Sequence, residues 1–114
     1  MNITHRDKDD IRILDIKDKI EIGRGDVALR ESILKSLDDN QRKIVLNLAK
    51  VSYIDSAGVG ELTRSYTTVS NAGGKLVLLN LTKKSRDLLT LTKLISVFDV
   101  YNDEQEAISD LQNV

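Results

Sequence analysis

The sequence predicts an α/β fold in a single domain, with a mostly parallel sheet and an antiparallel hairpin at its N-terminal edge. From residue 26 onward, segments with helical spacing of apolar residues alternate with short apolar runs, which is typical of parallel sheets with crossover helices. Two earlier apolar segments are separated only by the polar residues 7–10, as in a hairpin. The chain has 114 residues, so we expect one domain over residues 1–114 with the element order β-β-α-β-α-β-α-β-α.

The first three expected elements are the two strands of the hairpin and a helix. The strands lie around Ile3 and over residues 11–16. Gly23 and Gly25 then interrupt the chain, and Asp26 is placed to cap a helix that begins just after them. The apolar residues with helical spacing in this helix are Leu29, Ile33, Leu34 and Leu37.

The middle of the chain predicts an inner strand, a loop and a second helix. Residues 44–48 are apolar and rich in β-branched side chains, which suits a strand covered on both faces. Residues 49–60 are interpreted as a loop that leads into the helix. Gly73 and Gly74 are expected to end this helix with a left-handed cap. Its buried face is expected to consist of Val59, Leu62, Tyr66 and Val69.

The last third of the chain predicts two more strands and two more helices. Residues 75–79 form a buried strand, and a third helix starts at Thr82 or Lys83. After a strand over residues 97–101, Asp103 caps the fourth helix. The side chains expected to point inward are Leu88, Leu91 and Leu94 or Ile95 in the third helix, and Ala107, Ile108 and Leu111 in the fourth.

Charge and composition exclude several classes of function. The chain has 17 basic and 18 acidic residues, a net charge of −1, so we expect no direct contact with nucleic acid. It has no Cys and a single His, His5, which excludes thiolate sites and sites built from several histidines; we expect neither a metal nor a cofactor. Apolar runs fall short of the roughly 18–20 residues that a membrane span needs, and the N-terminus has no secretory signal. The expected location is therefore the cytoplasm, without a membrane partner.

Residues 49–60 are the most unusual stretch of the sequence. They should lie beyond the carboxyl end of a strand, which is where open α/β sheets usually place their functional sites. Asp55 and Ser56 fall where the helix should start, and either side chain could accept a hydrogen bond from the first turn. Gly58 and Gly60 follow inside that turn, and each costs about 1 kcal/mol relative to alanine. This cost indicates close approach of another surface or tight packing against a neighbouring strand.

The residues alone leave two interpretations of Ser56. One is a plain N-cap. The other is a modification or anion site, because a phosphate at a helix N-terminus meets free N–H donors and the positive end of the helix dipole. Nucleophilic catalysis is disfavoured because Ser56 is not in a Gly-x-Ser-x-Gly elbow and the only imidazole, His5, lies on a predicted edge strand.

Residues 51–60 read Val-Ser-Tyr-Ile-Asp-Ser-Ala-Gly-Val-Gly and follow the apolar run of residues 44–48. This pair of segments resembles the core of STAS domains, a family that includes the bacterial anti-sigma factor antagonists. The Gly-Gly and strand of residues 73–78, and the helix and strand of residues 85–98, are similar to the family's following elements. The resemblance extends over about residues 3–111 and implies the STAS fold.

The resemblance also implies a function. In the family, an anti-sigma factor that is also a serine kinase phosphorylates the acceptor serine with ATP. The unmodified protein binds that kinase and frees a sigma factor. The phosphorylated form dissociates from the kinase, and a PP2C-type phosphatase removes the phosphate. The chain would then be no enzyme but an anti-sigma factor antagonist with Ser56 as its phosphorylation site. The residues that would contact the partner are Glu21, Asp55, Ser56, Ala57, Gly58 and Gly60.

One segment departs from the family pattern, and other functions stay open. Many members carry Gly-x-Leu-Asp where residues 18–21 read Asp-Lys-Ile-Glu, so Asp18 replaces the glycine and Glu21 the aspartate. An alternative function is a STAS scaffold subunit of a larger assembly, such as a stressosome core or the cytoplasmic subunit of a lipid ABC transporter. A small phosphoacceptor or hydrolase that uses Asp55 is a third. The edge strand near Ile3 could also pair in a homodimer.

Overall fold

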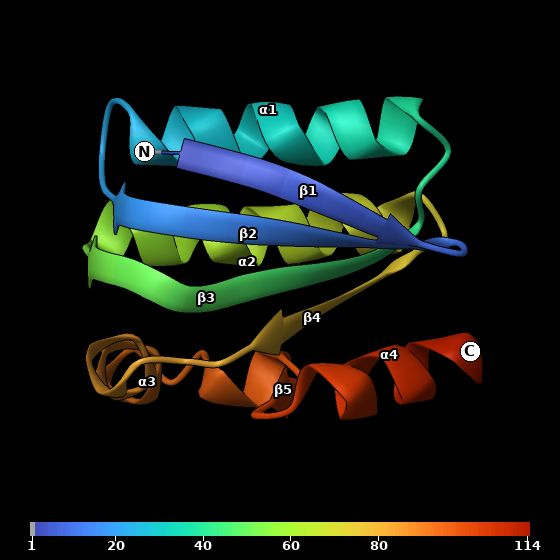
Figure 1. Cartoon of the computed structure of the whole chain (residues 1–114). Helices are drawn as coiled ribbons and strands as arrows, with labels where there is room; N and C mark the ends of the chain where they lie inside the picture. The colour runs from blue at the N-terminus through green and yellow to red at the C-terminus, as the bar shows by residue number, and fades with distance from the viewer. Residues whose placement is uncertain (1) are drawn as a thin grey trace.

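Within residues 2–114, which the computed structural model describes, five strands form one sheet in the spatial order β1-β2-β3-β4-β5 (Figure 1). The strands are β1 (Asn2–Lys8), β2 (Ile11–Ile20), β3 (Lys43–Ile54), β4 (Lys75–Leu79) and β5 (Val100–Tyr101). The helices of the same residues are α1 (Gly25–Asp38), α2 (Ser56–Asn71), α3 (Lys83–Leu91), α4 (Glu104–Gln112) and the short 3-10 helix η1 (Ile95–Val97). β1 and β2 are antiparallel, and the other neighbours are parallel. The predicted fold class, edge hairpin and element order are confirmed.

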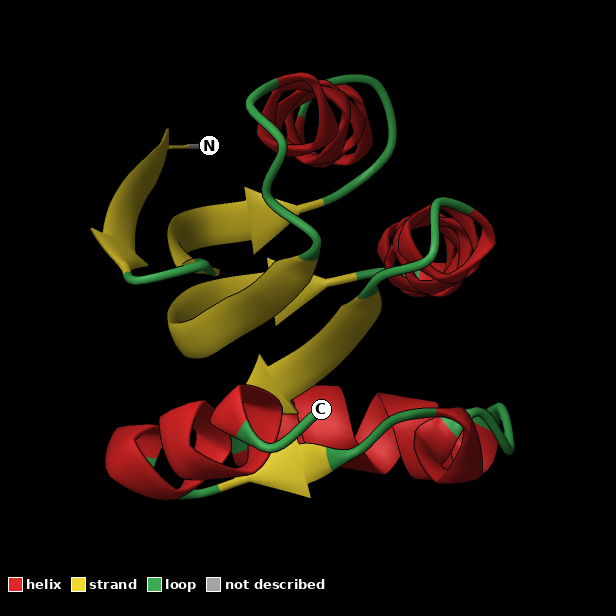
Figure 2. Ribbon diagram, turned by 90° about the vertical axis from the view of Figure 1, so that its right-hand side faces the viewer, coloured by secondary structure: helices red, strands yellow, loops and turns green. Residues whose placement is uncertain are grey.

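Alternate residues of the inner strands supply two apolar clusters, one on each face of the sheet. Ile44 and Leu46 of β3 belong to the larger cluster, where α1, α2 and α3 pack. Val45, which lies between them, belongs to the smaller cluster beneath α4. Figure 2 shows the sheet lying between α2 and α4. Because both faces are covered here, the apolar run of residues 44–48 is an inner strand, as predicted.

Most of the predicted buried faces are confirmed. In α2 and α4, the buried members are Val59, Leu62, Val69, Ala107, Ile108 and Leu111. Tyr66 is half-buried, and its ring meets that of Phe98 edge to face, with 5.6 Å between the ring centroids. Thr82 and Asp103 cap α3 and α4 as expected. Gly73 has a φ of +81°, which is the left-handed conformation predicted after α2.

Residues 49–54 are the second half of β3, and their interpretation as a loop was wrong. They continue to pair with β2 as far as the partners Ile20 and Ile54. The register shifts twice along this pair, so Val51 and Ile54 are buried while the residues between them are exposed. β3 continues this far because β2, which runs to Ile20, supplies hydrogen-bonding partners along it, and a search for strict alternation in one segment does not detect such pairing.

Two leucines that were expected to point inward are exposed. Leu34 of α1 is 48% exposed, because the helix buries Leu29 and Ile33 and one further residue turns about 100° away from that face. Leu91 is 79% exposed as the last residue of α3, and Leu89 is buried in its place.

The last predicted strand, over residues 97–101, is much shorter in the structure. Residues 95–97 form η1, and only Val100 and Tyr101 pair with β4. The side chain of Phe98 belongs to the larger apolar cluster, so packing of the ring takes this segment out of the sheet.

A buried arginine joins the hairpin to the end of α1. Arg12 is only 5% exposed, and its guanidinium donates to both carboxylate oxygens of Asp7 at 2.8 and 3.0 Å and to Asp39 at 2.8 Å. These bonds hold the pKa of Asp7 below its usual range. Lys35 and Arg12 together lower the pKa of Asp39 in the same way.

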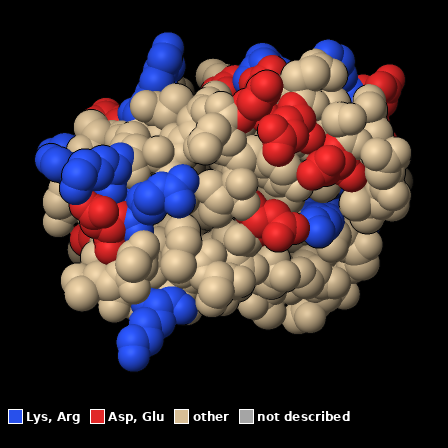
Figure 3. Space-filling view, turned by 90° about the horizontal axis from the view of Figure 1, so that it is seen from below, with Lys and Arg blue, Asp and Glu red and all other residues tan. Residues whose placement is uncertain are grey.

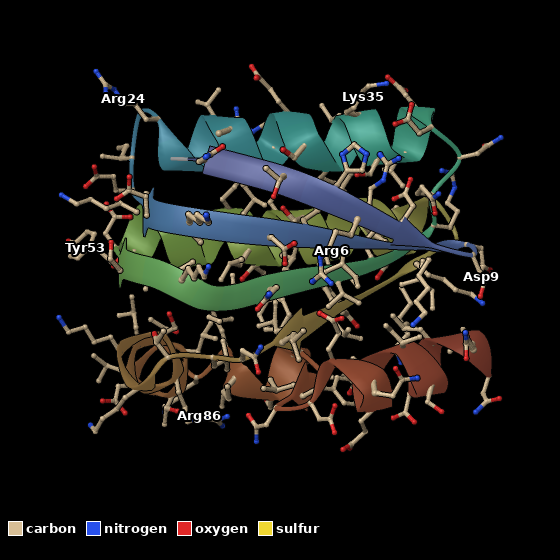
Figure 4. The ribbon with its side chains drawn as sticks, in the orientation of Figure 1. Arg6, Asp9, Arg24, Lys35, Tyr53 and Arg86 are labelled. Carbon is tan, nitrogen blue, oxygen red and sulfur yellow. The ribbon has the colours of Figure 1, made fainter. Side chains whose placement is uncertain are left out.

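A second arginine, Arg6 on the edge strand β1, links β2 to the start of α4 (Figure 4). Its guanidinium donates to Asp15 at 2.6 and 2.9 Å and to Glu104 at 2.7 and 3.0 Å. The amide of Asn47 on β3 also donates to Asp15, at 2.8 Å. Hydrogen bonds from Arg6 and Asn47 therefore stabilise the ionised carboxylate and lower the pKa of Asp15.

These lowered pKa values predict a loss of stability in acid. A carboxylate whose folded pKa lies below its unfolded value near 4 stabilises the fold fully above that value and loses the contribution as the pH falls through the folded pKa. We expect the free energy of unfolding in urea to fall steadily from about pH 5 downward. Asp15→Asn should be less stable at pH 6 and should show a shallower fall in acid. An unchanged pH slope in this variant would contradict the assignment to Asp15.

Candidate functional site

The carboxylate of Asp55 links the start of α2 to the loop that follows β2. Its Oδ1 accepts a hydrogen bond from the backbone N–H of Gly58 at 2.8 Å, and its Oδ2 accepts one from the N–H of Ile22 at 3.2 Å. The Asp55 N–H donates to the carbonyl of Ile20 at 3.3 Å. Asp55 is therefore the N-cap of α2, which decides between the two capping residues that the sequence left open.

Ser56 is the first residue of α2 and its side chain is exposed. Because Asp55 supplies the cap, the hydroxyl of Ser56 is not required to start the helix. The hydroxyl lies at the positive end of the helix dipole, next to the N–H groups of the first turn. A group attached to this oxygen would therefore project from the surface.

Gly58 and Gly60 occupy different environments, although they are two residues apart. A Cβ on Gly58 would overlap the carbonyl oxygen of Ile20 and would lie 2.8 Å from Cγ1 of Ile54. The close approach of α2 to the end of β2 thus explains this glycine. Gly60 is exposed, and a Cβ there would meet nothing within 4 Å, so the tight packing considered for both glycines applies to Gly58 alone.

The loop of residues 21–24, between β2 and α1, is held at several points. The Asp26 N–H donates to the carbonyl of Glu21 at 3.2 Å, and the Asp26 carboxylate accepts from the N–H groups of Gly23 and Val27, both at 2.9 Å. Asp26 is inside the first turn of α1 and not its cap, because the helix already begins at Gly25. Gly23 has a φ of +92°, which permits the sharp turn.

The structure brings most of the predicted site residues to one end of the molecule. This end holds the carboxyl ends of β2 and β3 and the first turns of α1 and α2 (Figure 1). Asp55, Ser56, Ala57 and Gly58 form the start of α2, and Glu21 is the neighbour of the residue that bonds Asp55. Glu21 also lines a hollow of about 220 Å³ with Asp18, Lys19, Arg24 and Gly25. Gly60 lies further along α2.

Sequence reasoning missed Ile22, whose N–H is bound by Asp55 and whose side chain is 74% exposed. The sequence did contain a signal. Ile22 stands directly before Gly23, after the predicted strand and before the predicted helix, so no predicted element would bury its large apolar side chain. The predicted strand ended at residue 16, so the position of Ile22 relative to Ser56 was not visible.

Two larger hollows, of about 440 and 300 Å³, lie along β1 and β2, and neither is lined by Asp55 or Ser56. On the face seen from below, basic and acidic side chains lie close to one another (Figure 3), in line with the net charge of −1. Within residues 2–114, no group of three His, Cys, Asp or Glu side chains is arranged to hold a metal ion. Among the helices of these residues, none combines the length and the apolar character that a membrane crossing requires.

The bonds of Asp55 predict a measurable loss on substitution. Asp55→Ala should lower the free energy of unfolding by about 1–2 kcal/mol, because the N–H groups of Gly58 and Ile22 lose their acceptor. Asp55→Asn should lower the free energy of unfolding by less, since an amide oxygen can still accept the capping hydrogen bond. Urea denaturation measures the stability, and amide hydrogen exchange at Ile22 and Gly58 should be faster in Asp55→Ala. A variant with wild-type stability and protection would contradict the bridging role.

The two glycines form a matched pair for a second prediction. Gly58→Ala should destabilise the fold by more than 1 kcal/mol, because the added methyl overlaps the Ile20 carbonyl. Gly60→Ala should be neutral or stabilise by about 0.5–1 kcal/mol, since its space is open and alanine favours the helix. Thermal or urea denaturation compares them, and equal effects of the two substitutions would refute the close approach at Gly58.

Known proteins share the fold described above. The family model of the STAS domain matches residues 2–107. The anti-sigma F factor antagonist of Paenibacillus polymyxa is 27% identical over 71 residues, which are 62% of this chain and 61% of that protein. The crystal structure of an anti-sigma factor antagonist from Mycobacterium paratuberculosis superposes with a TM-score of 0.84 at 20% identity, covering 97% of this chain and 93% of that one. The Bacillus cell fate determinant SpoIIAA in its phosphorylated form gives a TM-score of 0.73 at 18% identity, covering 96% and 98%.

The two solved structures show the shared fold, and the family model assigns the family. Because that model matches residues 2–107 of a chain of 114 residues, this protein belongs to the STAS domain family.

Proposed function

We propose that the protein is an anti-sigma factor antagonist, a regulator without enzymatic activity of its own, and that Ser56 is its phosphorylation switch. The observation that carries the proposal is the placement of Ser56 as the exposed first residue of α2, with the capping role taken by Asp55. The antagonists among its relatives, including the Paenibacillus polymyxa protein, support the general role.

In the proposed cycle, the unmodified protein binds an anti-sigma factor that is also a serine kinase, and a sigma factor is freed. After that kinase has phosphorylated Ser56, the protein dissociates from the kinase, and a PP2C-type phosphatase restores the hydroxyl. The predicted contact residues Glu21, Asp55 and Ala57 belong to the same end of the molecule as Ser56, and Gly60 extends the surface along α2. Gly58 is buried against Ile20 and Ile54, so its role is to pack the start of α2 and not to contact a partner.

The physics of the site suits such a switch. A phosphate adds about −1.5 to −2 charges at neutral pH. The fold itself tolerates this charge, because free N–H groups and the helix dipole lie at the start of α2. A partner that faces the site with carboxylates meets like charges, which cost several kcal/mol at an interface. Shifting a population from 1:99 to 99:1 requires about 5.5 kcal/mol, so one phosphate can supply most of the change.

Substitutions at Ser56 test the switch. Ser56→Asp should weaken binding to the anti-sigma factor kinase of the same genome by about tenfold or more, because it places a permanent negative charge in the interface. Ser56→Ala and Ser56→Asn should bind as the wild type does, and the Asn variant controls for the size of Asp. Isothermal titration calorimetry with the purified kinase gives the affinities.

Peptide-mapped mass spectrometry of the protein from its native host gives the second readout. The peptide that holds Ser56 should carry a phosphate whose occupancy differs between resting and stressed cells, and Ser56→Ala should abolish it. Equal affinities of Ser56→Asp and Ser56→Ala, no phosphate in any condition, or elution as a large particle from a size-exclusion column would each count against the proposal. The last outcome would favour a scaffold subunit.

A further inference from the structure

Ile22 exposes an apolar side chain at the end of the molecule that carries Ser56. Its exposed fraction is 74%, although a fully buried isoleucine stabilises a fold by about 1.5–3 kcal/mol. Two other large apolar side chains at this end are also exposed: Tyr53, which lies just before Ile54 at the end of β3, at 46%, and Val27 in the first turn of α1 at 38%. Single exposed apolar residues are common, and of these three only Ile22 is hydrogen-bonded to the residue that caps the helix of Ser56.

The loop that carries Ile22 is ordered by hydrogen bonds on both sides. The N–H of Ile22 is bound by Asp55, and the N–H of Gly23 is bound by Asp26. The carbonyl of Glu21 accepts from the N–H of Asp26. A side chain presented by a loop in one conformation loses little entropy on binding, which favours its use as an anchor.

The same carboxylate positions Ile22 and Ser56. Asp55 reaches Ile22 with one oxygen and caps the helix that begins at Ser56 with the other. A partner that lies close enough to Ser56 to respond to a phosphate therefore also reaches the loop of residues 21–24.

We propose that Ile22 is the apolar anchor of the partner interface, inserted into an apolar pocket on the anti-sigma factor kinase; this inference rests on the proposed function. The surface around Ser56 is continuous with Ile22 through Asp55, and this continuity favours the kinase over a second copy of the chain as the occupant. Burial of Ile22 contributes affinity only while the neighbouring Ser56 is neutral. A phosphate on Ser56 would have to lose water against the same apolar contact, which is unfavourable for a dianion.

Calorimetric titration of the purified anti-sigma factor kinase of the same genome into the full chain tests the anchor. Ile22→Ala should weaken binding by about tenfold or more, as truncation of a central interface residue does. Because Ile22 is exposed, the variant should keep the melting temperature of the wild type. Leu91→Ala is the matched control, since Leu91 is 79% exposed on α3, and it should bind as the wild type does.

The outcomes separate the anchor from the switch. Loss of binding in Ile22→Ala with wild-type binding of Ser56→Asp would support Ile22 as the anchor and would overturn the switch, together with the dependence of the anchor on a neutral Ser56. Wild-type binding of Ile22→Ala with loss in Ser56→Asp would overturn the anchor alone. An equal loss in Leu91→Ala, or a dimer of the free chain that Ile22→Ala converts to a monomer, would also overturn it. A wild-type chain that binds no anti-sigma factor kinase would overturn both.

Discussion

The hydrogen bonds of one carboxylate, that of Asp55, decide the geometry of the candidate site. One oxygen starts α2 at Gly58 and the other fixes the loop after β2 at Ile22. The two segments are distant in sequence, and this carboxylate joins them by side-chain hydrogen bonds. Because Asp55 caps α2, the hydroxyl of Ser56 is not needed to start the helix.

Backbone contact at the end of β2 completes this arrangement. Gly58 of α2 lies against the carbonyl of Ile20, and a Cβ on Gly25 of α1 would lie 2.5 Å from the carbonyl oxygen of Lys19. Both helices therefore begin in contact with the same strand end, at distances that only glycine permits. A strand end and two helix starts thus form one rigid unit, and the surface of this unit includes Ser56 and Ile22.

Elements set by local chemistry could be predicted from the sequence, and those set by pairing across the sheet could not. Residues 75–79 were placed correctly because four consecutive apolar residues, 76–79, follow the Gly73-Gly74 break, and the start of α3 follows from the capping side chain of Thr82. The end of β3 depends on its pairing with β2. Val51, Tyr53 and Ile54 favour a strand, but the polar residues 50 and 52 interrupt the apolar run, so the sequence pattern is interpreted as a loop. The same limit hid Ile22, and it left the choice between Asp55 and Ser56 as cap open until the loop after β2 was in place.

The separation between the core and the site explains how this domain can accept a change of charge. The apolar clusters lie on the two faces of the sheet, and the arginines Arg6 and Arg12 tie its edge strand to α4 and to the end of α1. Ser56 contributes to none of these contacts. A phosphate on its oxygen would act on what the surface can bind and would leave the stability of the fold nearly unchanged, because water and the first turn of α2 both solvate it. The proposed switch therefore needs no rearrangement of the protein, only a partner that must exclude water from Ser56 and Ile22 together.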